Sequence, residues 1–269
     1  MRNERYSRQS FLGPNAQGVI ERARVGVVGL GGGGSHVVQQ LAHVGFRNLV
    51  LYDPDLVEYS NLNRLVGASL RDSEKRATKI EVARRLVESL QPEAMLVTVK
   101  GRWQVEPGPL RGCDLVFGAV DGLNERGELE ICARRFMTPY IDIGLGVKAS
   151  GREAPRLTGQ VVLSMPGSPC FRCLGFLREE DLAEEAALYG DAGPRPQVVW
   201  ANGVLASTAV GLAVDLLTDW TLSRRGPVYL SYDGNTGVVA PHPRLAYAPK
   251  GACPHFPPDD VGDPSFISL

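Results

Sequence analysis

The chain has 269 residues, of which 43% are hydrophobic, enough to bury one large core or two modest ones. Its formal net charge of −1 gives no overall electrostatic reason to bind nucleic acid or an anionic membrane. The N-terminal residues lack the apolar stretch of a signal peptide, and no run of about eighteen apolar residues is evident, so we expect a cytoplasmic protein without a membrane segment.

Strand-like and helix-like segments alternate over the first half of the chain. Short apolar runs predict buried strands, and segments with apolar residues at helical spacing separate them. We expect a helix near residues 15–24, strands at 25–30, 48–52, 94–100, 114–120 and 139–144, and helices that start at Ser35, cover 73–90, and run from a cap at Asn124 to about 136. This order predicts an α/β fold: a Rossmann-like, mostly parallel sheet with helices on both faces.

The pattern changes after residue 150, where antiparallel strands are expected to extend the sheet. Residues 176–199 are charged and then rich in Pro and Gly, which predicts a mobile crossing loop. The other expected elements are a strand at 160–164, a buried apolar helix at 203–220 and a β-hairpin at 228–241. We therefore expect one domain over residues 1–250 and a poorly ordered Pro/Asp-rich tail over 251–269.

The glycine-rich stretch after the first strand is typical of a nucleotide-binding turn. Its pattern is G-x-G-G-x-G, formed by Gly29, Gly31, Gly32 and Gly34. Glycines let the backbone approach a phosphate, and the helix that we expect Ser35 to cap offers free N–H groups and partial positive charge. Asp53 ends the next strand about twenty residues on, where an acidic residue can reach a ribose. The stretch predicts a nucleotide site without identifying the nucleotide.

Five separated motifs resemble those of the ThiF/MoeB/HesA adenylyltransferases, which are relatives of the ubiquitin-activating enzymes. The motifs are Arg5-Tyr-Ser-Arg-Gln9, Gly29–Gly34, Asp53-Pro-Asp55 with Ser60-Asn-Leu-Asn-Arg64, the helical Lys79, and Asp121 with Arg126. Their order and spacing agree with the family over residues 5–126. Composition alone would make the first motif a solvated arm and Lys79 a surface lysine.

The resemblance implies that ATP activates the C-terminal glycine carboxylate of a ubiquitin-like or sulfur-carrier protein, giving an acyl-adenylate and pyrophosphate. A carboxylate then attacks a phosphate of like charge, so the site needs cations. By this resemblance, Arg64 and Lys79 supply positive charge, and Arg8 reaches in from the other subunit of a homodimer. Asp121 would bind Mg²⁺. The other implied contacts are Asp53 with the ribose, Ser60 and Asn61 with the phosphate region, and the backbone of Gly29, Gly31 and Gly32.

Five cysteines are an odd count for a reducing compartment and favour metal binding or buried thiols over disulfides. Cys170 and Cys173 occupy the place of the family's first zinc pair, and Cys253 that of the second. The family's second pair is C-x-x-C, but position 256 is Phe here, and the nearby His255 can complete a zinc site. Two alternatives stay open: His242 as the fourth ligand, or a degenerate site with free thiols.

Residues 174–202 contain no cysteine. Family members that form a thioester or an acyl disulfide keep one in this crossing segment. Cys113 precedes a buried strand and Cys132 lies in a helix, so each is most simply a small core residue. The chain therefore resembles an enzyme that adenylates its partner without a covalent cysteine intermediate.

Three alternative functions remain. The same chemistry could act on tRNA, as in the threonylcarbamoyladenosine dehydratase branch, or on a small peptide, although the near-neutral charge gives tRNA binding no support. The glycine turn alone would suit a dinucleotide-dependent dehydrogenase, which leaves Arg64 and Lys79 without a task. A non-catalytic scaffold that only docks a partner is the third.

Overall fold

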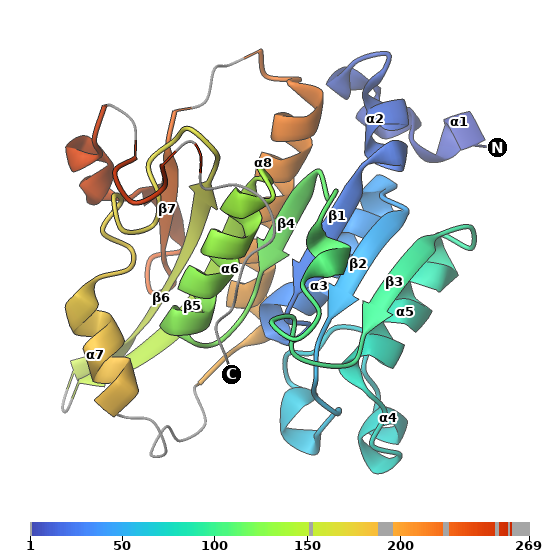
Figure 1. Ribbon diagram of the computed structural model, residues 1–269. Coiled ribbons are helices and arrows are strands. Elements are labelled where there is room, and N and C mark those ends of the chain that lie inside the picture. The colour runs from blue at the N-terminus through green and yellow to red at the C-terminus, as the bar shows by residue number, and fades with distance from the viewer. Residues whose placement is uncertain are drawn as a thin grey trace.

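A computed structural model describes residues 2–150, 153–187, 196–222, 226–250, 253–257 and 259. Its centre is one eight-stranded sheet with the order β3-β2-β1-β4-β5-β6-β7-β8 (Figure 1). The strands are β1 (Arg24–Val28), β2 (Asn48–Tyr52), β3 (Met95–Val99), β4 (Leu115–Gly118), β5 (Tyr140–Ser150), β6 (Glu153–Ser164), β7 (Val228–Asp233) and β8 (Val238–Pro241). The first five are parallel, and the last three continue the sheet antiparallel. The expected mixed sheet is confirmed.

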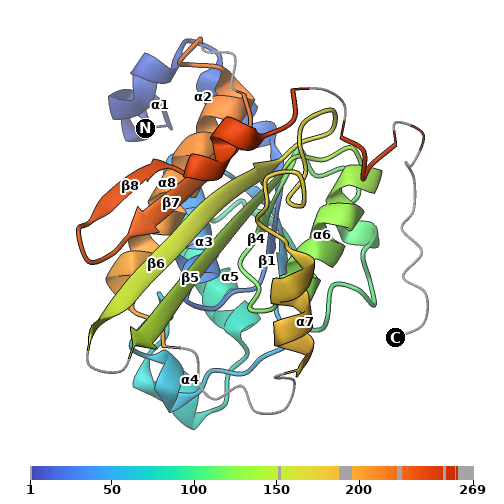
Figure 2. The same ribbon diagram turned by 90° about the vertical axis from the view of Figure 1, so that its left-hand side faces the viewer.

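Helices cover both faces of this sheet, as Figures 1 and 2 show. One face carries α3 (Gly32–Val44), α5 (Lys79–Leu90) and α8 (Val199–Thr218), whose apolar side chains form a single cluster with those of β1 and β5. The other face carries α6 (Leu123–Arg135), which packs with Trp103, Phe171 and Tyr140. The remaining helices are α1 (Arg2–Arg5), η1 (Ser7–Leu12), α2 (Ala16–Arg22), η2 (Tyr59–Asn61), α4 (Leu70–Glu74), η3 (Gly108–Leu110), α7 (Glu179–Ala187) and η4 (Pro243–Tyr247).

Several expected helix boundaries were wrong because local capping decides them. Ser35 lies inside α3, where its hydroxyl donates to the Gly32 carbonyl, and Gly31 is the N-cap. The helix expected over 73–90 is two helices, since Thr78 begins α5 with a capping box that includes Glu81. Gly122 rather than Asn124 caps α6.

The second half of the chain also differs from expectation in two places. The crossing segment is not a plain loop, because residues 179–187 form α7. The strand expected at 160–164 begins at Glu153, and its pairing with β5 makes a long hairpin. The tail expected to be poorly ordered lies outside the described residues except for 253–257 and 259. Cys253 there is buried.

Helix α8 is long and apolar enough to cross a membrane by length and composition, with a mean hydropathy of 1.4. This differs from the expectation that no such segment exists. Buried residues make up 56% of its apolar eighteen-residue window, and the helix packs against α3 and β5. The core position accounts for its composition, because a helix covered on several sides is apolar on several sides.

The polar segment between Arg64 and α5 is held by Asp72. Its carboxylate accepts two hydrogen bonds from the Arg85 guanidinium, both at 2.8 Å, and bonds from the Ser69 backbone and hydroxyl at 2.8 and 2.6 Å. These bonds fix α4 against α5. The hydrogen bonds from Arg85, with those from Ser69, hold the pKa of Asp72 well below its usual range.

Replacing Asp72 by asparagine is expected to lower the free energy of unfolding by about 1–2 kcal/mol at pH 7, because the amide loses charge-assisted bonds to Arg85. A carboxylate with a lowered folded pKa stabilises the fold above its unfolded pKa of about 3.9 and loses that contribution as the pH falls further. Urea unfolding of both proteins should therefore show a gap that is constant from pH 7 to about 5 and closes below about 4. A gap that stays constant down to pH 3 would contradict this account.

Candidate active site

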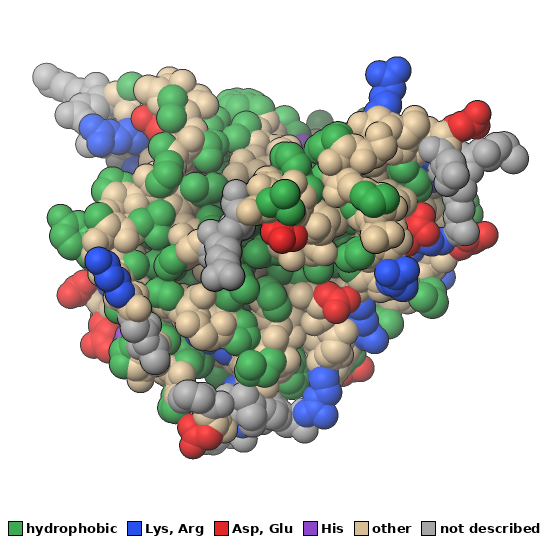
Figure 3. Space-filling model, turned by 90° about the horizontal axis from the view of Figure 1, so that it is seen from above, with side chains coloured by type: hydrophobic (Ala, Val, Ile, Leu, Met, Phe, Trp, Pro, Cys, Tyr) green, Lys and Arg blue, Asp and Glu red, His purple; other side chains and the backbone are tan. Residues whose placement is uncertain are grey.

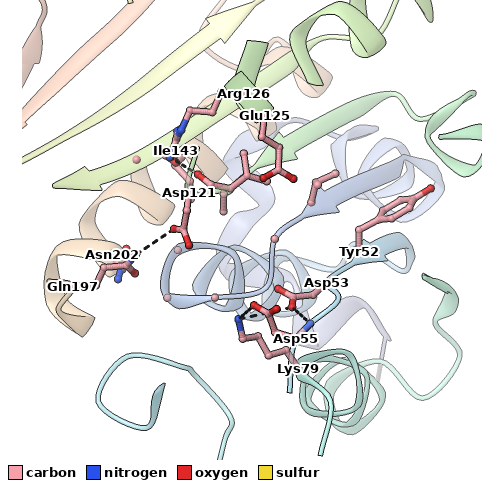
Figure 4. A pocket seen from close by; sticks show the side chains of 18 of the residues that line it. Tyr52, Asp53, Asp55, Lys79, Asp121, Glu125, Arg126, Ile143, Gln197 and Asn202 are labelled. Atoms are coloured by element: carbon pink, nitrogen blue, oxygen red, sulfur yellow. Dashed lines mark hydrogen bonds and ion pairs between the residues drawn. The ribbon is translucent and has the colours of Figure 1, made fainter. Parts of the chain in front are cut away.

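A cavity of about 280 Å³ opens where β1, β2 and β4 end, at the carboxyl edge of the parallel strands. Its lining includes the glycine turn, Asp53, Arg64, Lys79 and Asp121. Figure 4 shows the side chains of Asp53, Lys79 and Asp121. Ligands of open α/β sheets bind at this edge. Five motif positions that span residues 29–121 of the sequence therefore line the same cavity.

The glycine turn joins β1 to α3 and leaves the first N–H groups of α3 facing the cavity. Gly29 has φ of 86°, a left-handed conformation that favours glycine. A Cβ at Gly34 would lie 1.8 Å from the Gly29 carbonyl oxygen, so this close approach also requires glycine. With Gly31 as the N-cap, the turn offers a phosphate both close backbone access and the positive end of a helix.

Asp53 is buried and already organised by the backbone. Its carboxylate accepts the Leu30 N–H at 2.6 Å and the Asp55 N–H at 2.8 Å, which links the end of β2 to the glycine turn. Burial raises the pKa of Asp53, an effect opposed by the Lys79 ammonium. The Leu30 contact fixes the carboxylate beside the turn, where the ribose of a nucleotide is expected.

Lys79 begins α5 and reaches back toward the two carboxylates of the Asp53-Pro-Asp55 segment. Its Nζ lies 2.6 Å from Asp55 Oδ2 and 3.8 Å from Asp53 Oδ1. The side chain is only 13% exposed, so this charge is held at the cavity wall. Lys79 is therefore a half-buried cation at the cavity and not the solvated surface lysine that its helical position alone would predict.

Arg64 lines the cavity, whereas Ser60 and Asn61 serve the loop that carries it. The Arg64 guanidinium donates to the Ser60 carbonyl at 2.7 Å and to Asn63 Oδ1 at 2.9 Å. The Ser60 hydroxyl donates to Glu58, and Asn61 Oδ1 accepts the Glu58 N–H. Neither Ser60 nor Asn61 is among the lining residues of the described chain, so their expected contacts with the phosphate region remain predictions.

Asp121 follows β4 and lies at the cavity mouth beside Gln197. The Gln197 side-chain amide donates to Asp121 Oδ1 at 3.5 Å, and the Gln197 backbone carbonyl accepts from the Asn63 side-chain amide at 3.4 Å. These bonds connect three distant segments across one end of the cavity, as Figure 4 shows for Asp121 and Gln197. Sequence reasoning did not single out Gln197 or the neighbouring Asn202, because nothing in the local pattern indicates that the chain returns here.

Arg126 lies on α6 and lines the cavity, where it holds neighbouring backbone in place. It is 7% exposed and pairs with the fully buried Asp142, and it donates to the carbonyls of Val120 at 2.5 Å and Ile143 at 3.0 Å. The Tyr140 hydroxyl completes the network by donating to Asp142 at 2.9 Å. The motif residue Arg126 therefore braces the backbone just before Asp121.

The N-terminal motif is docked on the fold and is not a solvated arm. The Tyr6 hydroxyl accepts from Gln91 at 2.8 Å, and Gln9 donates to the Val44 carbonyl at 2.9 Å. Arg5 donates to the Leu90 carbonyl at 2.5 Å. Arg8 is exposed and does not line the cavity within the described part of this chain.

The four expected metal ligands meet in one cluster. The Sγ and Nδ1 atoms of Cys170, Cys173, Cys253 and His255 all lie within 4.8 Å of one another. The measured pairs are 3.3 Å for Cys170 to His255, 3.4 Å for Cys173 to His255 and 3.6 Å for Cys173 to Cys253. Bonds of about 2.3 Å to sulfur and about 2.0 Å to nitrogen in a tetrahedral zinc site put ligand atoms roughly 3.5–3.8 Å apart, so the residues fit that ion.

A buried network on α6 explains why His255 and not residue 256 faces the cluster. Phe256 packs on the Arg134 guanidinium, 4.7 Å from ring centroid to Cζ. Glu130 accepts the N–H of Phe171 at 2.8 Å, inside the Cys170–Cys173 turn. His242 was a wrong alternative, because it stacks on Tyr229 with ring centroids 4.0 Å apart.

Residues 5–254 match the ThiF family. The chain belongs to this family. It is 30% identical over 239 residues to the molybdopterin-synthase adenylyltransferase of Salmonella typhimurium, which covers 86% of this chain and 88% of that enzyme. It is 34% identical over 179 residues to the SAMP-activating enzyme E1 of Haloferax volcanii, covering 64% of this chain but only 61% of that protein.

The ThiF fold extends to solved structures. Escherichia coli MccB crystallised with ATP superposes with a TM-score of 0.74 over 97% of this chain and 75% of MccB, at 20% identity, which shows a shared fold. With curated relatives of nearly the same extent named as adenylyltransferases, this ThiF-family chain is an ATP-dependent adenylyltransferase.

Proposed function

We propose that this enzyme activates the C-terminal glycine carboxylate of a ubiquitin-like or sulfur-carrier protein as an acyl-adenylate. The observation that carries the proposal is the meeting of Arg64, Lys79, Asp53 and Asp121 around one glycine turn. The relatives' names point the same way, since they include activating enzymes for ubiquitin-like modifiers and for a molybdopterin synthase.

The charges of the cavity suit attack at the α-phosphorus of ATP. An oxygen of the acceptor carboxylate forms a bond to that phosphorus as the bond to the β-phosphate oxygen breaks, and pyrophosphate leaves. Negative charge accumulates on the phosphate oxygens during this exchange. The Arg64 guanidinium and the Lys79 ammonium provide fixed positive charge there, and Asp53 holds the ribose.

Asp121 suits a role in holding Mg²⁺ against the nucleotide. Mg²⁺ is commonly bound by one or two carboxylates together with substrate phosphates, and Asp121 is an exposed carboxylate at the phosphate end of the cavity. When bound, the ion would neutralise and orient the phosphates. Gln197 orients the carboxylate through its hydrogen bond to Oδ1.

The acyl-adenylate is proposed to leave the enzyme without a thioester. No cysteine lies in residues 174–202, and Cys113 and Cys132 are buried. Burial also raises the pKa of the Cys113 thiol to about 11 and that of Cys132 to about 12, which keeps both thiols protonated and poorly nucleophilic.

A homodimer in which Arg8 enters the second copy's cavity is part of the proposal. Arg8 is exposed on the docked N-terminal segment and lies away from its own cavity. The same segment presents Phe11, 67% exposed, in edge contact with Trp220. Figure 3 shows hydrophobic side chains spread over the face at the top of Figure 1, with Lys and Arg toward its edges and some Asp and Glu side chains nearer its middle. The Cys/His cluster is proposed to hold a structural Zn²⁺.

Exchange of labelled pyrophosphate into ATP tests the proposed substrate. We expect exchange with a sulfur carrier that ends in Gly-Gly, and at least about a hundredfold less with the same carrier lacking its last glycine, because truncation misplaces the attacking carboxylate. Exchange that depends on tRNA or on a short peptide would contradict the proposed acceptor. ATP binding without exchange for any acceptor would favour the scaffold.

A further inference from the structure

The expected positions of the phosphates and the ribose leave one end of the cavity for the nucleobase. Phosphates belong at the glycine turn and the ribose at Asp53, so the base must lie beyond Asp53, between the segment after β3 and the first turn of α6. That end is lined by Tyr52, Trp103 and Glu125. In the view of Figure 4, Glu125 lies between Asp121 and Tyr52, and Gln197 lies on the other side of Asp121.

Glu125 is held in place by a buried indole. Trp103 is 1% exposed and packs among the apolar side chains of the α6 face. Its Nε1 donates to Glu125 Oε1 at 3.1 Å, so the rigid ring fixes the carboxylate at the cavity wall. The indole engages one of the two carboxylate oxygens, and a carboxylate can accept several hydrogen bonds.

The charged groups around Glu125 affect its protonation, and therefore its ability to accept hydrogen bonds. The pKa of Glu125 is raised, chiefly by burial and also by the Glu128 and Asp121 carboxylates, while the Trp103 hydrogen bond and the nearby Arg102 guanidinium oppose that rise. Arg102 is exposed and lines the same end of the cavity. An ionised carboxylate only accepts hydrogen bonds and repels another acceptor that is placed against it.

We propose that Glu125 selects adenine over guanine nucleotides by accepting a hydrogen bond from the 6-amino group of the base. Guanine carries a carbonyl oxygen at that position, which would face the carboxylate acceptor to acceptor. Sites that read a polar group in this way reject an analogue lacking it strongly, because buried polar groups are left unpaired. Glu125 does not touch the reacting phosphate, so it acts on specificity, and the inference does not depend on which acceptor is adenylylated.

Isothermal titration with ATP and with GTP, each with Mg²⁺, tests the proposal on the unmodified protein and on Glu125→Gln. We expect the native protein to favour ATP by at least about a hundredfold and the variant to lose roughly tenfold to a hundredfold of that ratio, because an amide can present its NH₂ to guanine. Glutamine keeps an oxygen for the Trp103 N–H. Glu128→Gln is the matched control, since Glu128 lies on the same helix and pairs with Gln104 at 3.0 Å.

Purine riboside triphosphate, which lacks the 6-amino group, provides a second measurement. The native protein should bind it about tenfold more weakly than ATP, and that difference should shrink in Glu125→Gln. Melting temperatures without nucleotide report whether the variants fold. The proposal is overturned if the ATP to GTP ratio of folded Glu125→Gln stays within twofold of the native ratio, or if the native protein binds purine riboside triphosphate as tightly as ATP.

Discussion

Replacing Asp121 by alanine is expected to reduce partner-dependent pyrophosphate exchange by about 10²–10³-fold, and Arg64→Ala should have an effect of the same order. Asp121 and Arg64 both line the cavity, where we propose that Asp121 holds Mg²⁺ and Arg64 supplies positive charge. Both substitutions remove groups whose interactions strengthen as charge moves from the α-phosphorus to the leaving pyrophosphate. Turnover should therefore fall more than ATP affinity, because stabilisation limited to the transition state affects kcat.

The control for these variants is a charge change of the same kind away from the cavity. Glu88→Ala and Arg84→Ala remove an exposed ion pair on α5, 2.8 Å between its charged atoms, and should leave exchange within about twofold. ATP affinity measured by titration separates lost binding from lost turnover. Exchange at the native rate in Asp121→Ala or Arg64→Ala would rule out the roles proposed for these residues.

The residues at the ends of strands could be placed from the sequence because parallel strands bring their carboxyl ends to one edge. Asp53 and Asp121 each follow a short apolar run, and the glycine turn follows another, so a shared cavity was implied by local patterns alone. The mixed sheet was predictable for the same reason. Apolar runs separated by helical periods predict parallel strands, and the later hairpin predicts an antiparallel extension.

What the sequence could not supply depends on tertiary placement. Gln197 and Asn202 reach the cavity only because the chain crosses the sheet and returns at the start of α8. Arg126 was noted only as part of the motif that begins at Asp121, and its ion pair with Asp142 was not foreseen, because no local pattern reveals the burial of that partner. Glu125 was missed likewise, since only the packing of Trp103 directs it to the cavity.

The hydrophobic pattern also does not determine where helices begin or which side chains face the metal-ligand cluster. Ser35 and Asn124 are good cap residues by type, but a glycine two to four residues earlier begins each helix instead. Phe256, at the position where the family pattern has a cysteine, packs on Arg134, while His255 joins the three cysteines. The Cys/His cluster lies apart from the nucleotide cavity in the described chain and brings Cys253 and His255 against the segment between β6 and α7 that carries Cys170 and Cys173.

Removal of one ligand from the cluster is expected to abolish stoichiometric zinc binding and to lower the free energy of unfolding by about 2–4 kcal/mol, because metal binding free energy contributes to folding in structural sites. Cys173→Ala is the variant of choice, since its sulfur lies 3.4 Å from His255 Nδ1 and 3.6 Å from Cys253 Sγ. Metal analysis should give one zinc per native chain and about a tenth of that or less in the variant. Treatment of the native protein with a chelator should reproduce the loss of stability.

Cys113→Ala controls for removal of a buried thiol that is outside the cluster, and it should keep its zinc while losing only packing energy. Nucleotide titration separates an effect on the cluster from an effect on the nucleotide cavity. None of the four ligands lines the cavity, so ATP affinity in folded Cys173→Ala should remain within a fewfold of native below its melting temperature. A native protein that holds no zinc after refolding with it, or a Cys173→Ala variant with native stability in the presence of zinc, would show that the cluster is a set of free thiols. Cys113→Ala should keep its zinc and its ATP affinity, whereas Cys173→Ala should lose both zinc and stability. That result would assign the metal a structural role, tying the C-terminal residues to the segment between β6 and α7.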